Sequence, residues 1–516
     1  MRTVQRIAVG VGPLSEADVV AVARHGAGVT IDAHAVDAIA ESRKTVEELA
    51  QDSEPHYGIS TGFGALATTS IPSDRRGALQ RSLIRSHAAG SGPEVEREVV
   101  RAMMLLRLST LATGRTGVRA ETAQTLAALL DAGITPVVYE YGSLGCSGDL
   151  APLAHVALAL IGEGTVRMPD GSPLAAAEAL VGVGIAPVEL AEKEGLALIN
   201  GTDGMLGQLL LACHDLDLLL RTADISAAMS VEATLGTAAV FAADLHALRP
   251  QPGQAIAAAN MRALLADSPI IASHAGPDCA YVQDAYSMRC APQVAGAARD
   301  TLAHARTVAA YECASAVDNP VVTLDGRVES NGNFHGAPIG YVLDFLAIPV
   351  ADLASMSERR TDRMLDVTRS RGLAPFLAGD PGVDSGHMIA QYTQAAIVSE
   401  LKRLAVPASV DSIPSSAMQE DHVSMGWSAA RKLRLGVDGL TRVLAVELLT
   451  AARALDLRAP LLPGPATGAV VAALRQSVPG PGPDRHLAPE IKAAVDFVRS
   501  GAAVAAADAV LPEPLR

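Results

Sequence analysis

Aromatic residues, cysteine pairs and closely spaced histidines are all scarce in this chain of 516 residues. Aromatic side chains make up only 3% of it. Its five cysteines, an odd number without a CxxC pair, predict reduced thiols rather than a disulfide framework; they are residues 146, 213, 279, 290 and 313. No two of the thirteen histidines are closer than the nine residues between His25 and His34. HxH, HxxxH and HExxH are therefore excluded, and we expect no metal site.

Signals for nucleotides, nucleic acids and membranes are also missing. Neither GxGxxG nor GxxxxGK[ST] occurs, so no phosphate-binding loop is predicted. The net charge of −15 argues against a nucleic-acid partner, which would need clustered Lys and Arg. We find no signal peptide and no uncharged apolar run of about 20 residues, the length of a membrane span. These absences predict a cytoplasmic protein without a membrane or nucleic-acid partner.

Helix-forming residues are what the chain has in abundance. Hydrophobic residues make up 49%, mostly Ala, Leu and Val, which favours helices. We expect a mainly α fold, a bundle of long helices with a smaller mixed N-terminal region. The expected domains are residues 1–115, mixed α/β, and residues 116–516, the helical bundle. Expected helices include 120–130, 205–220, 426–457 (one helix, or two joined near 436–439) and 489–510.

The tripeptide Cys146-Ser147-Gly148, inside the segment 142–153, is the most informative feature. The Gly148 nitrogen can attack the Cys146 carbonyl, because glycine lacks a Cβ and allows unusual backbone angles. Loss of one water closes a five-membered ring, and loss of a second from Ser147 leaves an exocyclic methylene. The product, a 4-methylidene-imidazol-5-one, is an electrophile formed autocatalytically without a diffusible cofactor. By itself the segment also fits a tight turn into a helix, with Ser147 or Asp149 as N-cap.

Six more polar or glycine-rich clusters occur along the chain: 57–64, 85–92, 194–204, 283–290, 329–336 and 415–425. Each alone is typical of ordinary structure, such as an Asn-Gly turn, a helix cap or a surface salt bridge. Tyr286 and Arg289 are three residues apart and share a face of a helix or turn. The guanidinium fork of Arg289 suits a carboxylate. The carboxylate of Glu420 can accept an imidazole N–H.

Together, and in this order, the seven clusters resemble those of the histidine and aromatic amino acid ammonia-lyases. The match covers residues 57–425, most of the chain. Three positions depart from the usual pattern: Cys146 stands where the family usually has alanine, Ser60 where histidine lyases often have asparagine, and Met418 where many of them have asparagine. The resemblance implies a fold of long helices and a homotetramer whose active sites combine loops from several subunits.

The resemblance also implies residue roles. Tyr57 is the expected acid/base, with Glu420 as the second candidate; such a tyrosine needs a pKa well below its usual ~10. Asn200 and Tyr286 would stabilise the ring made from Cys146, Ser147 and Gly148. The remaining roles are carried by residues that bind substrate or line the ring: His87, Gln283, Arg289, Glu420 and Phe334.

The run Gln419-Glu420-Asp421-His422 is characteristic of the histidine-specific members of the family, and the Ser86-His87 pair fits a polar substrate side chain. The resemblance therefore implies non-oxidative conversion of the small-molecule substrate L-histidine to trans-urocanate and ammonia. A tyrosine ammonia-lyase or tyrosine 2,3-aminomutase is the alternative enzyme, and a helical scaffold whose ring never forms is the alternative without activity.

Overall fold

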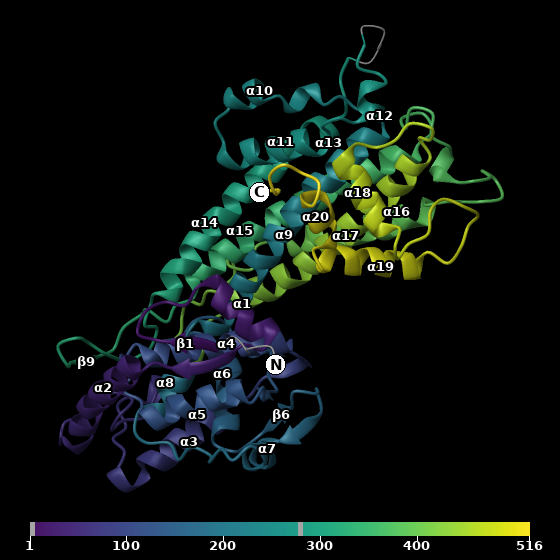
Figure 1. Ribbon diagram of the computed structural model, residues 1–516. Helices are drawn as coiled ribbons and strands as arrows, with labels where there is room; N and C mark the ends of the chain where they lie inside the picture. The colour runs from purple at the N-terminus through teal and green to yellow at the C-terminus, as the bar shows by residue number, and fades with distance from the viewer. Residues whose placement is uncertain (1–5, 277–281) are drawn as a thin grey trace. The chain divides into compact units, whose positions relative to one another are not determined.

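The computed structural model describes residues 6–276 and 282–516 (Figure 1), and Cys279 lies outside them. The described chain is mainly helical, which confirms the predicted fold class. It divides into two compact units. The first unit contains Met1–His214, Ala305–Asp344 and Pro407–Arg431, and the second contains Asp215–His304, Phe345–Val406 and Lys432–Arg516. The predicted boundary at residues 115/116 falls inside the first unit and stays a prediction.

The first unit combines helices with short strands. Its helices are α1 Glu16–His25, α2 Ala33–Gln51, α3 Arg76–His87, α4 Arg97–Ala112, α5 Ala120–Asp131, α6 Leu150–Leu160, α7 Ala176–Gly182 and α8 Glu194–Ile199. Strand β1 (Arg6–Val9) pairs in parallel with β2 (Gly28–Ile31). The other pairings are antiparallel: β3 Ser91–Glu94 with β5 Tyr139–Tyr141, β4 Thr135–Pro136 with β6 Thr165–Arg167, β6 with β7 Pro173–Ala175, and β8 Val321–Val322 with β9 Val328–Glu329.

Local sequence explains where these helices begin and end. Ser15 caps α1 in a capping box with Asp18, and Gly26 ends the helix at φ 68°, a conformation that suits glycine. Helix α4 is the buried centre of the unit, because every residue from 99 to 112 is buried. It contacts α1, α2, α5 and α6. A helix that is buried on all faces needs neighbours on all sides.

Helices α3, α6 and α8 pack against one another (Figure 1). The amide oxygen of Gln80 in α3 accepts the N–H of Gly195 in α8 at 2.8 Å. The C-terminal end of α3 carries His87, the N-terminal end of α6 follows the Cys146-Ser147-Gly148 tripeptide, and α8 leads into Asn200. The packing of three helices therefore positions three of the predicted site segments.

The second unit has its own helices: α10 Ala243–Ala247, α11 Pro252–Leu264, α12 Pro269–Ala272, α13 Tyr286–Arg289, α16 Met388–Leu404, α18 Pro465–Leu474, α19 Ala488–Arg499 and α20 Ala502–Asp508. The division between units falls inside four long helices: α9 Asp203–Ala233, α14 Ala291–Cys313, α15 Ala337–Leu365 and α17 Gly426–Asp456. The 3₁₀ turns are η1 Gly64–Leu66, η2 Ser73–Arg75, η3 Ala239–Phe241, η4 Pro375–Leu377 and η5 Ser416–Met418.

Most of the predicted helices are confirmed and one is wrong. Helix α5 matches the prediction for 120–130, α9 contains 205–220, and α17 is a single helix across 436–439. The predicted helix 489–510 is instead two helices, α19 and α20. Gly501 lies between them at φ 75°, a left-handed conformation that ends a helix, and the Ala-rich composition concealed this break.

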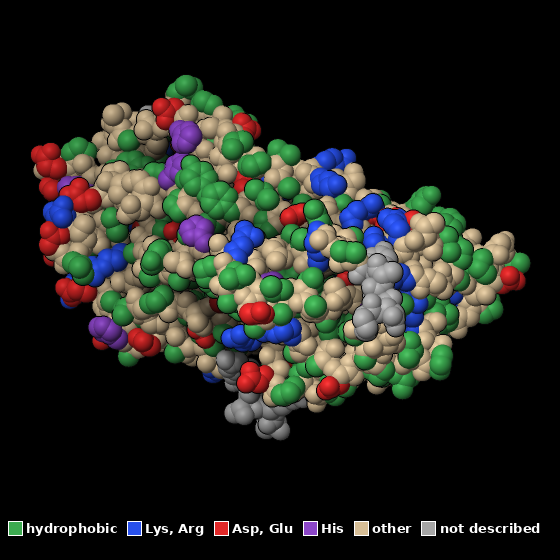
Figure 2. Space-filling model, turned by 90° about the horizontal axis from the view of Figure 1, so that it is seen from above, with side chains coloured by type: hydrophobic (Ala, Val, Ile, Leu, Met, Phe, Trp, Pro, Cys, Tyr) green, Lys and Arg blue, Asp and Glu red, His purple; other side chains and the backbone are tan. Residues whose placement is uncertain are grey.

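Surface and core composition agree with a protein whose apolar residues are mostly internal. On the face seen in Figure 2, Lys and Arg side chains are interspersed with Asp, Glu and hydrophobic ones. The segments Glu194–Ala233 and Ala337–Leu365 are long and apolar enough to cross a membrane by length and composition alone. Their most apolar windows are 100% and 61% buried within the protein, as core helices are. Cys146, Cys213, Cys290 and Cys313 are free thiols, as predicted.

Candidate active site

The loop that precedes α6 is anchored along its whole length. The carbonyl oxygen of Gly145 accepts hydrogen bonds from Ser424 Oγ at 2.6 Å and from the Gly336 N–H at 3.0 Å. The Met425 N–H donates to the Leu144 carbonyl at 2.9 Å. Segments that are distant in sequence therefore hold the backbone immediately before the Cys146-Ser147-Gly148 tripeptide.

Asp149 occupies the N-cap position of α6, but its carboxylate does not cap that helix. Instead Oδ1 accepts from Ser143 Oγ at 2.9 Å, and Oδ2 accepts from the Met205 N–H of α9 at 2.9 Å. Burial raises the pKa of Asp149 to about 7. Asp149 therefore does not have the N-cap role of the alternative turn interpretation; its carboxylate links the tripeptide loop to the start of α9.

Gly148 lies too close to Gly201 for any side chain. A Cβ on Gly148 would stand 2.2 Å from the Gly201 oxygen and 2.6 Å from its nitrogen. Gly148 also has φ 79°, which L-residues with side chains rarely adopt. The Asp149 N–H donates to the Gly201 carbonyl at 2.7 Å. Both the conformation and the contact require glycine at the position whose nitrogen would close the ring.

Glu420 is in direct contact with the tripeptide. Ser147 Oγ donates to Glu420 Oε1 at 2.7 Å, and Cys146 Sγ donates to Glu420 Oε2 at 3.1 Å. Ser415 Oγ donates to the same Oε2 at 2.8 Å. Residues 146, 147 and 420, which the sequence connects only through separate clusters, are therefore brought together.

Backbone geometry presents Glu420 from a tight loop. Ser415 and Glu420 face each other in an isolated antiparallel bridge, and the residues between them, Ser416, Ala417 and Met418, have φ from 50° to 70°. Burial raises the pKa of Glu420, but hydrogen bonds from Ser147, Cys146, Ser415 and Ser416 outweigh it, so its pKa is lowered from the usual value of a glutamate. Glu420 is an ionised acceptor at neutral pH.

His87 ends α3 as a neutral ring with a fixed orientation. Its Nδ1 lies 2.9 Å from the Leu83 carbonyl oxygen, which can only accept, so Nδ1 carries the proton. Nε2 is then an acceptor. Burial lowers the pKa of His87, while the Leu83 carbonyl and the negative charge of Glu420 act in the opposite direction. The charge of Glu420 is thus close enough to affect His87.

Asn200 follows α8 and is 5% exposed. Its side-chain Oδ1 is buried and has no hydrogen-bond partner within residues 6–276 and 282–516. Its backbone carbonyl accepts from Arg107 Nη1 at 2.8 Å. A buried amide without a partner costs free energy unless a ligand or prosthetic group satisfies it.

The Tyr57 loop contacts α8 and, through η1, the loop that carries Glu420. Gly58, at φ 75°, leaves no room for a Cβ, which would stand 2.7 Å from Leu196 Cδ1 of α8. The Tyr57 hydroxyl accepts the N–H of Gly64 at 3.3 Å. Gly64 begins η1, which contacts η5 just before Glu420. Tyr57 is therefore linked to both the Asn200 helix and the Glu420 loop.

Phe334 is half-buried in the loop before α15. The loop is fixed at Gly336, whose N–H bonds Gly145, and at His335, whose ring stacks on His422 at 5.7 Å between centroids. The 329–336 cluster is thereby connected to both the tripeptide loop and the 415–425 cluster.

Gln283, Tyr286 and Arg289 belong to the second unit. Gln283 is exposed, and Tyr286 is 70% exposed. The guanidinium of Arg289 lies 4.7 Å from the centre of the Tyr286 ring, which confirms that the two share a face of α13. Arg289 Nε is buried and has no hydrogen-bond partner in the described part of the chain.

The turn that carries Arg289 is held by buried ions. Asp284 accepts from the Thr237 N–H at 2.7 Å and from Arg371 at 3.1 Å. Arg360, paired with Glu447 at 2.5 Å, donates to the Ser287 carbonyl at 3.1 Å. The backbone on either side of Tyr286 is therefore fixed, although the Tyr286 side chain is not covered.

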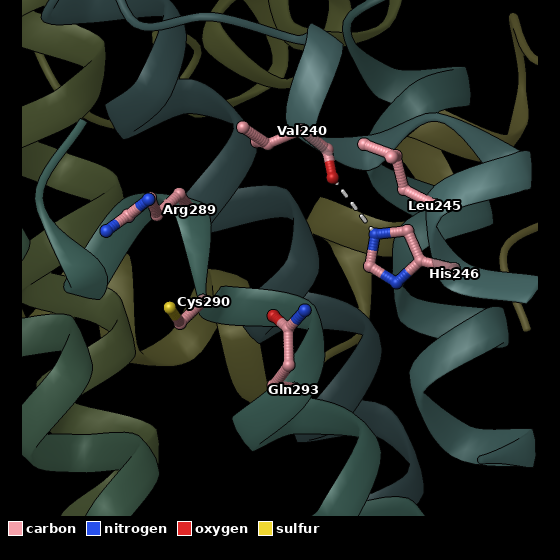
Figure 3. A pocket seen from close by; sticks show the side chains of 6 residues that line it. All are labelled: Val240, Leu245, His246, Arg289, Cys290 and Gln293. Atoms are coloured by element: carbon pink, nitrogen blue, oxygen red, sulfur yellow. Dashed lines mark hydrogen bonds between the residues drawn. The ribbon is translucent and has the colours of Figure 1, made fainter. Parts of the chain in front are cut away.

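Arg289 also borders a cavity of about 240 Å³ (Figure 3). In Figure 3, Arg289 and Cys290 lie on one side and Leu245 and His246 on the other. His246 Nε2 lies 3.1 Å from the Val240 carbonyl, and its Nδ1 lies 3.0 Å from Gln254 Nε2. Both His246 nitrogens are satisfied, which leaves the Arg289 guanidinium as the cation of this cavity.

The first unit thus assembles Tyr57, His87, the tripeptide, Asn200, Phe334 and Glu420, while Gln283, Tyr286 and Arg289 stand in the second. Sequence reasoning missed Ser143, Ser415 and Ser424, because serines in loops carry no distinctive signal. Arg107 was also missed, although a charge inside the apolar run 103–108 was a visible sign. No His, Cys, Asp or Glu cluster suited to a metal ion occurs among residues 6–276 and 282–516.

Comparisons with known proteins identify the family of the chain. The aromatic amino acid lyase family profile matches residues 14–476. The chain is 65% identical to the histidine ammonia-lyase of Streptomyces coelicolor, over 99% of both chains. Its structure is similar to tyrosine aminomutase from Streptomyces globisporus (TM-score 0.93, 39% identity, 99% of this chain and 100% of that one). It is also similar to histidine ammonia-lyase from Trypanosoma cruzi (TM-score 0.91, 38% identity, 99% and 96%). The chain belongs to the aromatic amino acid lyase family.

Proposed function

We propose that this chain is a histidine ammonia-lyase, which converts L-histidine to trans-urocanate and ammonia. The observation that carries the proposal is the contact of Glu420 with Ser147 and Cys146, near the neutral acceptor ring of His87. An ionised carboxylate beside the reactive tripeptide suits a substrate side chain that donates an N–H. Relatives named histidine ammonia-lyase at 65% identity support this substrate.

We infer that Cys146, Ser147 and Gly148 form a 4-methylidene-imidazol-5-one in the mature enzyme. Two features fit this group: Gly148 has no room for a Cβ, and the buried Asn200 Oδ1 has no partner in the described chain. The group supplies an electrophile for the substrate amine, which ordinary side chains lack. Gly148, Ser147 and Cys146 would hold it covalently, with Asn200 and Tyr286 beside it as polar partners.

The chain's own residues then bind and orient the substrate. Arg289 would hold the carboxylate, because its fork matches two carboxylate oxygens and its Nε has no partner in the described chain. Gln283 would line the same part of the site. Glu420 would accept the imidazole N–H, and His87 Nε2 would face the same ring as a second acceptor. Phe334 would cover the site and exclude water.

Removal of the β-proton needs a base, and Tyr57 is the proposed one. Its hydroxyl is held by the Gly64 N–H and would take the proton from the substrate β-carbon. Glu420 is the second candidate, since it is ionised, but a carboxylate engaged with the imidazole is less free to serve as base. Mutations at the two positions separate these roles by their effects on kcat and KM.

A tyrosine 2,3-aminomutase is the competing function, because a structure named tyrosine aminomutase has a TM-score of 0.93 to this chain. Its identity to this chain is 39%, against 65% for the Streptomyces coelicolor histidine ammonia-lyase. Glu420 within the run Gln419-Glu420-Asp421-His422 also favours histidine, because this run resembles that of the histidine-specific members. We further propose a cytoplasmic homotetramer, in which subunits together complete each site.

The test measures urocanate formation from histidine beside product formation from tyrosine and phenylalanine. Intact-mass spectrometry of the same preparation should show a deficit of two waters (~36 Da), as expected for this covalent modification. Histidine turnover with that deficit supports the proposal. Equal or better turnover of tyrosine would move the assignment to the aminomutase or tyrosine lyase, and a full unmodified mass in active enzyme would contradict the ring.

A further inference from the structure

Arg107 is a completely buried cation in the middle of α4. Its Nη1 donates to the carbonyl oxygens of Asn200 at 2.8 Å and Ala197 at 3.2 Å, and its Nη2 donates to that of Val317 at 2.9 Å. Its Nε lies 3.3 Å from Asp203 Oδ2. Burying a charge in this way is costly, and hydrophobic side chains of similar size often give equal stability. The contacts of Arg107 therefore point to a role other than stabilising the fold.

Arg107 belongs to a set of buried charges beneath Asn200. Lys193 and Asp318 form an ion pair of 2.5 Å in which neither side chain is exposed. Burial raises the pKa of Asp203 and Asp318 and lowers that of Lys193, in each case against the attraction of the opposite charges. Two cations and two anions are thus gathered around one short stretch of backbone.

That stretch is in contact with the reactive tripeptide. A Cβ on Gly201 would stand 2.6 Å from Arg107 Nη2 and 2.8 Å from Arg107 Cζ. A Cβ on Gly148 would in turn stand 2.2 Å from the Gly201 oxygen. Gly201 therefore touches both the guanidinium and the glycine whose nitrogen closes the ring, with no side chain between them.

We infer that Arg107 is a positioning residue for ring closure. Its fork fixes the Asn200–Gly201 backbone, and this backbone is the surface against which Gly148 must lie when its nitrogen approaches the Cys146 carbonyl. In that closure a C–N bond forms, and the Cys146 carbonyl oxygen leaves as water with the N–H protons of Gly148 and Ser147. Loss of a second water, from the Ser147 hydroxyl and its Cα proton, then gives the methylene. Arg107 exchanges no atom; it sets the geometry. The inference rests on the proposed function, because it presupposes that the ring forms.

The chain offers a matched control in the same helix. Arg101 is 1% exposed, and it donates to the carbonyls of Val22 at 3.1 Å and Leu130 at 3.2 Å. It holds other backbone, six residues away from Arg107. Arg101→Lys and Arg107→Lys each keep the cation and lose the fork. A general loss of stability would follow from either substitution, whereas only Arg107→Lys alters the support of Asn200 and Gly148.

The experiment purifies wild type, Arg107→Lys and Arg101→Lys as full chains and measures three quantities. Intact mass and near-ultraviolet difference absorbance give the fraction of chains with the ring, and kinetics normalised to that fraction give kcat and KM. We expect full ring content in wild type and Arg101→Lys, and a several-fold lower content in Arg107→Lys. In the ring-bearing fraction of Arg107→Lys, kcat should fall about tenfold or more, because Asn200 is displaced.

Equal ring content and equal normalised kcat in Arg107→Lys and Arg101→Lys would overturn the inference while leaving the proposed function intact. Absence of the mass deficit in wild type would instead defeat both. If Arg107→Lys does not accumulate, the double variant Arg107→Met/Asp203→Asn removes both charges of the pair and leaves no uncompensated ion. The same ring deficit is expected there, and full ring content in it would overturn the inference.

Discussion

The Ser147 region and the Arg289 region differ in how completely their polar groups are satisfied. Around Ser147, the hydroxyls of Ser147 and Ser415 and the thiol of Cys146 all donate to Glu420. Around Arg289, Tyr286 is 70% exposed, and Arg289 Nε is buried without a partner in the described chain. We call the Ser147 region closed, because the groups that contact Ser147 satisfy one another, although the neighbouring Asn200 Oδ1 has no partner in the described chain. We call the Arg289 region open, because the buried Arg289 N–H is left to donate to a ligand.

This difference corresponds to the two expected tasks of the regions, ring closure and carboxylate binding. Ring closure is intramolecular and gains most from a backbone held rigidly in one arrangement, as at Gly148 and Gly201. Carboxylate binding needs donors that are oriented but not yet occupied, as in Arg289, whose flanking backbone is fixed through Asp284 and Ser287. We therefore expect mutations in the first region to affect ring content, and mutations in the second to affect substrate binding.

Ser147→Ala should have the largest effect and tests the closed region directly. Without the hydroxyl there is no second water to lose, so the methylene cannot form. We expect activity to fall on the order of 10⁴-fold or more, as when other essential catalytic groups are removed. Urocanate formation and intact mass measure the two consequences.

Folding serves as the control for Ser147→Ala. The variant should keep its circular dichroism and thermal stability, because Ser147 is only partly buried and its partner Glu420 retains bonds from Cys146 and Ser415. Wild-type activity in Ser147→Ala would contradict both the ring and the role assigned to this region.

Glu420→Gln should separate substrate recognition from ring formation inside the closed region. A glutamine oxygen can still accept from Ser147, so ring content should be normal. The imidazole N–H loses its charged acceptor, a loss of about 1–3 kcal/mol, or roughly 5- to 150-fold in kcat/KM for histidine. Steady-state kinetics and intact mass check the two parts. Loss of the ring in Glu420→Gln would show that this carboxylate is needed for closure itself.

The tripeptide of the closed region could be recognised in the sequence for a physical reason. Ring closure requires Gly148 and a Ser147 hydroxyl, so the chemistry leaves a short local motif. Helices 120–130 and 205–220 could also be predicted from the sequence, because apolar periodicity is a local property. The break at Gly501 could not be predicted, since one glycine in an Ala-rich segment is compatible with one continuous helix or with two helices.

Contacts between distant segments could not be predicted from the sequence. The hydrogen bond from Ser147 to Glu420 joins residues 273 positions apart, and no periodicity encodes it. As an ordinary turn, the segment would have used Ser147 or Asp149 as the N-cap of α6, yet the Asp149 carboxylate accepts the Met205 N–H of α9. Tertiary packing decided the partner in both cases, and a serine or aspartate in a loop has many possible partners.

Arg289→Lys should test the open region, with a smaller effect than the changes above. Lysine keeps the charge and loses the bidentate fork. We expect KM for histidine to rise about tenfold with a smaller loss of kcat, and ring content to stay normal. Arg262→Lys is the control, because Arg262 donates to the Phe241 carbonyl at 2.7 Å in the same unit. Unchanged kinetics in Arg289→Lys would place the carboxylate site elsewhere.

The buried carboxyl of Asp149 gives the closed region a pH signature. Burial raises its pKa from 3.8 to about 7, so between these values the folded chain holds a proton that the unfolded chain has released. The free energy of unfolding therefore falls as pH rises through this window, by up to about 1.4 kcal/mol per pH unit for one proton. Asp149→Asn lacks this titration.

Calorimetric melting temperatures between pH 5 and 7 measure the effect. Relative to Asp149→Asn, wild type should lose stability as pH rises. A constant difference between the two proteins over this range would show that Asp149 is ionised in the folded state throughout.

Cys146→Ala should have the smallest effect and shows how much the departure from the family's usual alanine contributes. Burial raises the pKa of the Cys146 thiol to about 12, so it stays protonated and donates to Glu420 Oε2 at 3.1 Å. Removing one such donor costs about 0.5–1.5 kcal/mol, which corresponds to a change of roughly 2- to 13-fold in KM for histidine. The pKa of Glu420 should rise, because hydrogen bonds hold it down, and the acidic limb of the pH–rate profile should move to higher pH.

Ring content in Cys146→Ala should be unchanged, since residue 146 gives the ring only its carbonyl carbon. Cys146→Ser supplies a hydroxyl donor and should restore both properties. An acidic limb at the same pH in wild type and Cys146→Ala would mean that the thiol does not position Glu420 during turnover.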